Sequence, residues 1–333
     1  LEKVLDGNVA ALMLTNPSTL GLFEPNIEKI CDMVHAVGGQ VFCDGANMNA
    51  MVGLTRPGDH GFDCMHLNLH KTFSTPHGGG GPGCGAIGLK SHLSPFQPSP
   101  VLRRDASRKG VETVHDLETS VSEGTADAAV VVDEDRPQSI GRVSGFYGQF
   151  LMEVRAYTYL RAFGREKMHT ISHHAVLNAN YVRSRLKDVL PPAHDRYCMH
   201  ECILTAEPLK KETGVRALDI SKRLIDYGFH PPTNYFPLIV PECLMIEPTE
   251  TEAKETLDEF CDAMVSIVEE ARRDPDLLHN APTSTIVGRL DETMAVKQLD
   301  VRWKAPRIES PANRETAPGE GFEGIRADTV PAA

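Results

Sequence analysis

Two side chains that could do chemistry together are Lys71 and Asp44, each placed directly after a short apolar segment. Lys71 follows HLNLH, and Asp44 lies 27 positions earlier, after QVFC. A lysine amine can form an imine with the aldehyde of pyridoxal phosphate (PLP), and a carboxylate can keep the pyridine nitrogen of that cofactor protonated. The pair predicts a PLP site in which Lys71 is the catalytic residue, bound covalently to the cofactor as an imine, and Asp44 holds the ring.

Both residues also have purely structural interpretations. A carboxylate at the end of a strand often caps a loop, and most lysines are simply solvated. The Asp-x-Ala spacing of DGANMNA favours the cofactor, because the small side chain of Ala46 can pack flat under a ring. Burial of Lys71 at the end of an apolar strand would favour the neutral amine that imine chemistry needs. We therefore expect Lys71 to be desolvated.

Three further polar residues could contact the same cofactor. His70 and Thr72 flank Lys71, and they could either hydrogen-bond a phosphate group or cap the turn. Asn16 follows an early apolar run, where its amide could reach the phenolic oxygen of the cofactor or close an Asx turn before Pro17. The predicted cofactor-binding set is Asn16, Asp44, Ala46, His70, Lys71 and Thr72.

Glycines 78–81 and the following Pro82-Gly83 allow backbone conformations and close approaches that other residues cannot adopt. The segment is neither a dinucleotide fingerprint nor a Walker loop, because a predicted strand follows it and no Gly-Lys-Ser/Thr sequence occurs. This disfavours nucleotide binding.

Cys198, His200 and Cys202, with His194 nearby, contain the residue types of a metal site. No second pair at zinc spacing accompanies these residues, and the segment has the pattern of a strand. We therefore predict no metal site.

The elements that must position the candidate residues alternate between strand and helix in the first quarter of the chain. Residues 9–14 form a continuous apolar run, typical of a parallel strand buried on both faces. Apolar residues at helical spacing follow over 27–37 and stop at Gly38-Gly39. Further strands are predicted at 40–43, 64–69 and 84–89. This order predicts an α/β fold with polar residues gathered at the carboxyl ends of strands.

The rest of the chain predicts a smaller α/β unit after a long connection. Residues 91–143 are rich in proline, charge and turn residues, as in connecting or active-site segments. Helices are predicted at 146–163 and 165–190. In the smaller unit we expect strands at 201–206, 238–240 and 243–247 and helices at 216–227 and 251–273, the last with a capping box of Thr249 and Glu252.

These patterns divide the chain into four parts. Residues 1–145 are predicted to belong to a large domain, 146–190 to be connecting helices and 191–275 to be a small α/β domain. Residues 276–333 are predicted to be an extended tail, disordered over 310–333, where proline, glycine and charge dominate.

Composition limits the classes of partner. The formal net charge of −12 argues against binding to nucleic acid or an anionic membrane surface. No apolar run reaches the length of a membrane span. The eight cysteines are scattered through apolar patterns, which predicts a reducing, cytoplasmic compartment. Because the chain starts with Leu1 and soon enters a strand, we expect that an N-terminal portion is missing.

Several segments together carry a resemblance to a known family. The segments are LTNPSTLGLFEPNI, FCDGANMNAMVGLTRPGDHGFDCMHLNLHKTFSTPHGGGGPG, HHAVLNANYVRSRL, DYGFHPPT and MIEPTETEAKETLDEFCDAM. They cover most of residues 9–270 and resemble the P-protein of the glycine cleavage system, glycine decarboxylase, in its C-terminal half or separate second subunit. The resemblance implies a fold-type-I PLP-dependent transferase, similar to aspartate aminotransferase, with part of the large domain, a mostly parallel sheet and a smaller C-terminal α/β domain.

The resemblance also implies an activity. Glycine would lose CO₂, and its aminomethyl group would pass to the lipoyl arm of H-protein, which makes the enzyme a glycine dehydrogenase (aminomethyl-transferring), an oxidoreductase. Lys71 would be the imine-forming lysine, Asp44 the partner of the pyridine nitrogen, and His70 and Thr72 neighbours of the phosphate. The expected assembly is a homodimer or a heterotetramer with a related first subunit.

One departure from the family bears on this expectation. Fold-type-I domains take a phosphate-binding loop and a group stacked on the cofactor from earlier strands, and this chain starts after them. The alternatives are therefore another fold-type-I PLP enzyme, such as an amino-acid decarboxylase or desulfurase, or a catalytically incomplete fragment that serves assembly.

Overall fold

The structure is a computed structural model that describes residues 1–104, 130–133, 135–144, 147–300 and 302. It divides into two units, Leu1–Arg289 and Leu290–Ala333. The second unit contains helix α10 (Glu292–Lys297), whose first turn is capped by Asp291 through a hydrogen bond from the Met294 amide to its carboxylate. The predicted disorder of 310–333 and much of the long connection lie outside the described residues.

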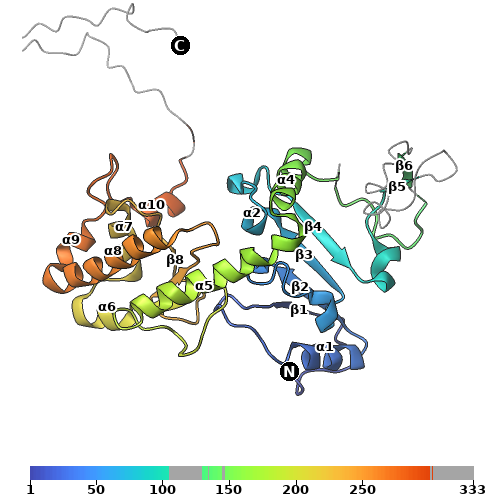
Figure 1. The fold of residues 1–333 in the computed structure, drawn as a ribbon, viewed down its shortest axis with the longest axis horizontal. Helices are drawn as coiled ribbons and strands as arrows, with labels where there is room; N and C mark the ends of the chain where they lie inside the picture. The colour runs from blue at the N-terminus through green and yellow to red at the C-terminus, as the bar shows by residue number, and fades with distance from the viewer. Residues whose placement is uncertain (105–129, 134, 145–146, 301, 303–333) are drawn as a thin grey trace, which may run out of the picture. The chain divides into compact units, whose positions relative to one another are not determined.

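A four-stranded sheet forms the first part of the larger unit. Its strands are β1 (Ala11–Thr15), β2 (Gln40–Gly45), β3 (Cys64–Asn68) and β4 (Gly85–Leu89), in the order β1-β2-β3-β4 (Figure 1). The first three run parallel, and β4 is antiparallel to β3 with Asn68 paired to Gly85. The predicted mostly parallel α/β sheet is therefore confirmed.

Helix α1 (Ile27–Ala36) connects β1 to β2 and packs on the sheet. Its apolar residues recur at helical spacing, so that one stripe faces the core and the polar face remains outside. The buried cluster joins the helix to the strands and contains Ile27, Cys31, Val34, Val41, Cys43 and Phe62. The helix predicted at 27–37 is confirmed within one residue at its end.

The predicted long connection is partly structured. Its described part contains a six-residue 3₁₀ helix at Ser91–Phe96 and an antiparallel pair, β5 (Val101–Arg104) with β6 (Val130–Asp133). Helices α4 (Phe150–Lys167) and α5 (His169–Leu186) follow, close to the predicted positions. Helix α5 contacts the segment after β2 at one end and β7 (Cys202–Thr205) and α8 (Lys254–Arg273) at the other, so it links the two sheets (Figure 1).

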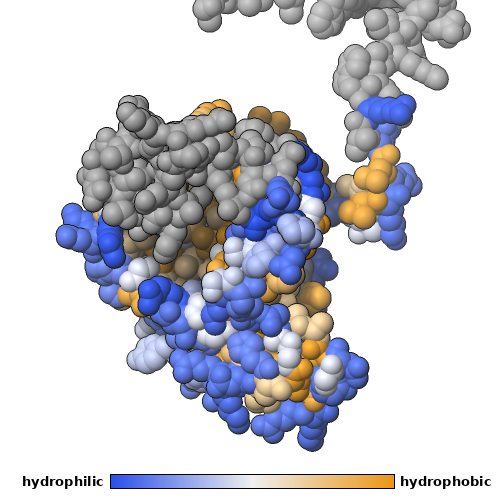
Figure 2. All heavy atoms as spheres, turned by 90° about the vertical axis from the view of Figure 1, so that its right-hand side faces the viewer, coloured by the Kyte–Doolittle hydropathy of each residue, from blue (hydrophilic) through white to orange (hydrophobic). Residues whose placement is uncertain are grey.

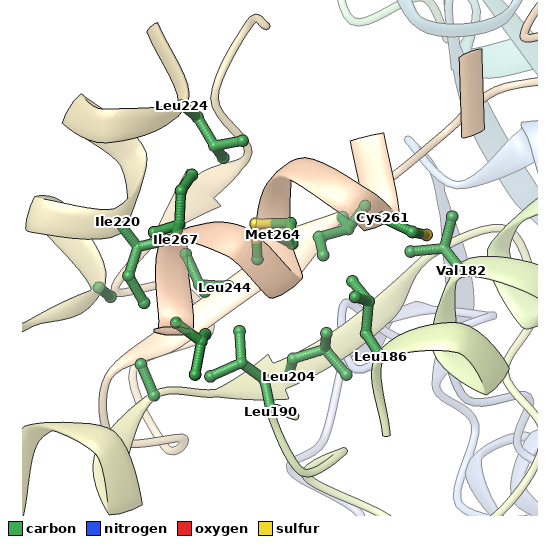
Figure 3. Packing of buried hydrophobic residues seen from close by; sticks show 14 of the residues in the cluster. Val182, Leu186, Leu190, Leu204, Ile220, Leu224, Leu244, Cys261, Met264 and Ile267 are labelled. Carbon is green, nitrogen blue, oxygen red and sulfur yellow. The ribbon is translucent and has the colours of Figure 1, made fainter. Parts of the chain in front are cut away.

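The second sheet is antiparallel, with β7 and β8 (Thr233–Asn234) on either side of β9 (Cys243–Ile246). Helices α6 (Glu207–Thr213), α7 (Ala217–Asp226), α8 and α9 (Pro275–His279) accompany it. Burial of the apolar faces of α5, α7 and α8 against β7 and β9 forms the largest core of the molecule (Figure 3). The labelled residues are Val182, Leu186, Leu190, Leu204, Ile220, Leu224, Leu244, Cys261, Met264 and Ile267.

Two local predictions in this part are wrong. No strand forms at 238–240, where Leu238 and Ile239 are exposed and the Val240 amide instead donates to the Pro237 carbonyl, closing a turn. Pro237 and Pro241 flank this segment and cannot donate to a strand ladder, so the apolar run does not pair. The short strand β8 lies earlier in the chain.

The predicted capping box of Thr249 and Glu252 is also wrong. Helix α8 begins at Lys254 after Ala253, with no side-chain cap. The Asn178 amide donates to the carbonyls of both Thr249 and Glu252, which holds this segment in a turn before the helix. A tertiary hydrogen bond has replaced the local one that the pattern predicted.

The described part of the surface is mostly hydrophilic on the face drawn in Figure 2, with smaller apolar areas between the hydrophilic ones. Within the described residues, no helix combines the length and apolar character that a membrane crossing requires. The predicted boundaries at 145, 190 and 275 lie inside the larger unit and remain predictions.

Candidate active site

Lys71 follows the carboxyl end of β3, as predicted, in the single helical turn α2 (Leu69–Thr72). Leu69, Thr72 and Phe73 share the inner side of this turn and are buried, since residues three and four apart lie on one face of a helix. Lys71 therefore points outward and is exposed. The expected burial of Lys71 is not found, because the turn buries its neighbours instead.

Asp44 lies at the carboxyl end of β2, next to β3 in the parallel part of the sheet. It pairs with His66 in the strand register, and its Oδ1 lies 3.3 Å from His66 Nε2. The same oxygen accepts a hydrogen bond of 2.8 Å from the backbone amide of Ala46. Asp44 thus caps the loop after β2, and this hydrogen bond holds Ala46 beside the carboxylate. Asp44 and Lys71 end neighbouring parallel strands at one edge of the sheet.

The residues that flank Lys71 contain buried polar atoms. His70 Nδ1 and Thr72 Oγ1 are inaccessible to solvent and have no hydrogen-bond partner among the described residues, and the same is true of Thr75 Oγ1. Burial lowers the pKa of His70, and the charges of His77 and Lys71 lower it further. Buried polar groups are nearly always paired, so three such atoms around one lysine fit a polar group that is bound there. Thr75 was not among the predicted residues.

Asn16 is buried, and its side-chain amide hydrogen-bonds to the backbone of Glu24. Its Oδ1 accepts from the Glu24 amide at 2.9 Å, and its Nδ2 donates to the Glu24 carbonyl at 3.5 Å. The side chain therefore closes the loop after β1 across eight positions, a longer closure than an Asx turn. Contact of Asn16 with a cofactor remains a prediction.

Three titratable side chains near Lys71 were not in the predicted set: His200, Glu201 and Glu247. His200 and Glu201 precede β7 and are 1% and 2% exposed in their side chains, and Glu247 follows β9. His200 Nε2 lies 4.0 Å from Glu201 Oε2 and 3.7 Å from Glu247 Oε1. We call these three residues the His-Glu-Glu cluster.

The protonation of the His-Glu-Glu cluster is strongly perturbed. Burial and, to a smaller extent, the charge of Lys71 together lower the pKa of His200 to about 4. Burial raises the pKa of Glu201 to about 8, with Glu247 adding to the shift and Lys71 opposing it. Burial also raises the pKa of Glu247, again against the charge of Lys71. Lys71 thus acts electrostatically on all three residues, and His200 is neutral while Glu201 holds a proton at neutral pH.

Contacts between the two sheets bring this cluster to the end of the first sheet. The Met199 amide donates to the Gly21 carbonyl at 2.7 Å. Gly21 has a positive φ of 69°, and a Cβ there would lie 2.1 Å from the backbone oxygen of Glu201. Glu250 is held by Asn49, which follows β2, at 3.2 Å and by Tyr159 of α4 at 2.8 Å. The site is therefore built from segments of both sheets.

Gly45 fixes the spacing of β2 and β3 beside Asp44. A Cβ at this position would lie 1.8 Å from the backbone oxygen of His66. We expect Gly45→Ala to destabilise the chain by roughly 1–3 kcal/mol or more, because the strands must separate to admit the methyl group. Urea unfolding measures the change. Gly58→Ala, where a Cβ meets nothing within 4 Å, is the matched control, and equal losses in the two variants would contradict the argument.

The pKa of Glu201 predicts a pH-dependent stability. The pKa of Glu201 is about 8 in the folded chain, whereas the ordinary pKa of a glutamic acid is 4.5. Between these two pH values the unfolded chain therefore binds fewer protons than the folded chain. The contribution of Glu201 to the free energy of unfolding therefore falls as the pH rises from 4.5 to about 8. Glu201→Gln cannot titrate and should gain stability over the unmodified chain, by a few kcal/mol at the upper end.

Unfolding measured at several pH values between these limits tests this expectation. The exposed Glu212, which pairs with Arg272, provides the control variant Glu212→Gln. A stability difference between Glu201→Gln and the unmodified chain that does not change with pH would show that Glu201 titrates normally.

A family model and the curated relatives agree in what this chain is similar to. Residues 171–283 match the family model described as glycine dehydrogenase, C-terminal domain. The probable glycine dehydrogenase (decarboxylating) subunit 2 of Lysinibacillus sphaericus is 52% identical over 304 residues, 91% of this chain and 58% of that protein. The protein of the same name from Desulforamulus reducens is 52% identical over 303 residues, with the same shares covered.

Two solved structures share the fold. A crystal structure of glycine decarboxylase (P-protein) of the glycine cleavage system, in inhibitor-bound form, superposes with a TM-score of 0.61 at 17% identity, over 79% of this chain and 56% of that one. An alanine–glyoxylate aminotransferase from Nostoc sp. superposes with a TM-score of 0.51 at 14% identity, over 78% of this chain and 62% of that one. The predicted fold class, that of the fold-type-I PLP enzymes, is confirmed.

The curated relatives are longer than this chain, which spans about 58% of their length. The aligned part covers 91% of this chain, and about half of its residues are identical. Over that span the chain is similar to the probable glycine dehydrogenase (decarboxylating) subunit 2 proteins, and its residues 171–283 match the C-terminal domain of glycine dehydrogenase.

Proposed function

We propose that the chain provides the lysine-bearing part of a PLP-dependent glycine decarboxylase of the glycine cleavage system. The observation that carries the proposal is the placement of Lys71 and Asp44 at the carboxyl ends of neighbouring parallel strands. Ligands of open α/β sheets bind at this edge. The names of the curated relatives supply the reaction class.

The residues present fit PLP. Lys71 is exposed and can reach a ligand with its amine, while Asp44 offers a carboxylate beside the short side chain of Ala46. His70 Nδ1 and Thr72 Oγ1, both without partners among the described residues, would hold polar atoms of the cofactor near Lys71. When bound, PLP would accept the electron pair that the departure of CO₂ leaves behind. In this proposal Asp44 holds the proton on the pyridine nitrogen, and Lys71 is the covalent attachment point.

The substrates and partners belong to the same proposal. Glycine would be decarboxylated, and lipoylated H-protein would receive the aminomethyl group. The relatives are named as second subunits, which supports a partner first subunit in a heterotetramer, with a homodimer as the other arrangement. A cytoplasmic location is likewise proposed.

Exchange of labelled bicarbonate into glycine in the presence of lipoylated H-protein and PLP tests the function. The chain is assayed alone and together with a glycine dehydrogenase subunit 1. The chain spans 58% of the length of its curated relatives, and we expect exchange in the mixture. Comparison of the two assays shows whether subunit 1 is required for activity. Exchange in neither assay would contradict the proposal.

A catalytically incomplete assembly subunit is the second candidate, and the same shortfall in length favours it. The discriminating observation is PLP binding by the purified chain. A chain that binds no PLP in either assay mixture, yet associates with subunit 1, would support the assembly role. Decarboxylation of another amino acid without any requirement for H-protein would instead support a different fold-type-I enzyme.

A further inference from the structure

His66 is a polar residue beside Asp44 to which the proposed function assigns no role. It lies in β3 and pairs with Asp44 of β2 in the strand register, so both side chains project from the same face of the sheet. His66 Nε2 lies 3.3 Å from Asp44 Oδ1, and each side chain is 25% exposed, so a ligand could still reach the carboxylate. The two residues are therefore in direct contact at the edge of the sheet where the proposed function places the cofactor.

The partners of His66 determine which of its ring nitrogens carries the hydrogen. Nε2 makes a hydrogen bond of 3.2 Å with Asn68 Oδ1, two residues farther along β3, and lies beside Asp44 Oδ1. An amide oxygen and an ionised carboxylate can only accept hydrogen bonds. Nε2 is therefore the protonated nitrogen, and its hydrogen is directed toward these two oxygen atoms.

Neighbouring side chains hold the imidazole ring of His66 in place. The ring stacks on Phe42 of β2, with the ring centroids 5.7 Å apart and an angle of 29° between the planes. On the other side, Ile87 of β4 pairs with His66 in the strand register. A ring that is fixed by both adjacent strands loses little further conformational freedom when it contacts the carboxylate.

The contacts of the Asp44 side chain involve one of its two oxygen atoms. Oδ1 accepts a hydrogen bond from the Ala46 amide at 2.8 Å and is also the oxygen beside His66 Nε2. Within the described part of the chain, both of these contacts use Oδ1, which leaves Oδ2 for a donor on a ligand. The protonated pyridine nitrogen of PLP is a donor of this kind.

We propose that His66 is a positioning residue that holds the Asp44 carboxylate so that Oδ2 faces the pyridine nitrogen of PLP. His66 and the Ala46 amide together fix Oδ1, which restricts rotation of the carboxylate before the cofactor binds. A hydrogen bond to an ionised carboxylate is charge-assisted and is stronger than one between neutral groups. The inference rests on the proposed function, because Oδ2 acquires this partner only when PLP is bound.

The competing interpretation is that His66 and Asp44 form a cross-strand pair that only stabilises the sheet. A second pair of this kind lies at the opposite end of β3, where His92 Nε2 is 3.5 Å from Asp63 Oδ1. A purely structural pair should affect unfolding and leave the affinity for PLP unchanged. A positioning residue should mainly affect the affinity, because it preorganises a group that binds the cofactor.

The contact is tested first in the full chain without PLP, by NMR of the ring nitrogens of His66. We expect the hydrogen on Nε2, and Asp44→Ala should shift the Nε2 resonance because an acceptor is lost. Asp59→Ala is the control, since Asp59 lies in an exposed turn and pairs with Arg56. Asp44→Asn keeps an oxygen for the Ala46 amide and should also shift the resonance, so it serves if Asp44→Ala does not fold. An Nε2 resonance that neither Asp44 variant shifts would overturn the proposal.

The second measurement is the dissociation constant of PLP, from the visible absorbance of the bound cofactor, in the chain alone and together with subunit 1. His66→Phe keeps an aromatic ring beside Phe42 but cannot donate a hydrogen bond, and it should weaken PLP binding by on the order of tenfold. His66→Gln retains an N–H donor and should recover most of the affinity. His92→Phe is the matched control and should bind PLP as the unmodified chain does.

A double-mutant cycle shows whether His66 acts through Asp44. Asp44→Ala leaves no carboxylate to hold, so the addition of His66→Phe should cause no further loss of PLP affinity. Losses of affinity that add up in the double variant would overturn the proposal. PLP binding that is equal in His66→Phe and the unmodified chain, with a lower urea midpoint in His66→Phe, would favour the structural pair and overturn this inference alone. Absence of PLP binding in every variant and in the unmodified chain would overturn the proposed function with it.

Discussion

Lys71→Ala should abolish stable PLP binding and lower any glycine–bicarbonate exchange by on the order of 10³-fold or more, the loss typical of a removed covalent residue. The amine is the covalent attachment point in the proposed function, and alanine cannot replace it. Lys71 is exposed and makes no ion pair within the described part of the chain, so the fold should be unaffected. Visible absorbance of bound PLP, measured after removal of the free cofactor, reports the result.

Lys211→Ala provides the control for this experiment. Lys211 lies on α6, is exposed and pairs with Glu207 one helical turn away, which contributes little to stability. It should bind PLP as the unmodified chain does. Retention of the visible band in Lys71→Ala would show that another lysine carries the cofactor and that the placement of Lys71 and Asp44 has been misinterpreted.

Leu244→Ala should destabilise the chain by about 2–5 kcal/mol. Leu244 is fully buried in the middle of β9, where it pairs with Leu204 of β7 and belongs to the core formed with α5, α7 and α8 (Figure 3). Truncation removes apolar contacts and leaves a cavity that surrounding helices can fill only in part. Chemical denaturation followed by far-ultraviolet circular dichroism measures the loss.

The same substitution at Leu238 is the control. Leu238 is 84% exposed and lies in the neighbouring turn, so Leu238→Ala should change stability by less than about 0.5 kcal/mol. Comparable losses at the two positions would mean that β9 does not form the centre of this core.

The sequence predicts the first sheet well because its signals are local. The apolar runs that became β1, β2 and β3 are short and bounded by turn residues. The predicted burial of the first run on both faces is wrong, because Ala11 and Met13 of β1 are exposed. Once three strands are parallel, residues at their carboxyl ends must share an edge. The relation of Lys71 to Asp44 could therefore be predicted from topology alone.

The His-Glu-Glu cluster could not be predicted in this way. Glu247 lies far along the chain from His200 and Glu201, and the antiparallel pairing of β7 with β9 brings them together. The signal in the sequence is the adjacent His200-Glu201 pair before an apolar strand. Burial of an acid cannot be deduced from its neighbours in sequence.

The exposure of Lys71 shows the limit of a strand-based interpretation. An apolar strand before the lysine suggested a buried amine, but the chain forms a helical turn immediately after Asn68. The direction of a side chain in that turn depends on which neighbours fill the core, and Leu69 and Phe73 do so.

The antiparallel strand β4 has a consequence for how the lysine segment can vary. Because Asn68 and Gly85 are paired, the chain leaves the sheet and returns to it at the same rung, and the sheet itself closes the loop that carries Lys71. The pairing of β3 with β4 offsets the conformational entropy that is lost when this loop closes, and that loss grows only slowly with loop length. The glycines at 78–81 can accordingly change in number or composition and alter access to the site, while Lys71 stays anchored at the end of β3.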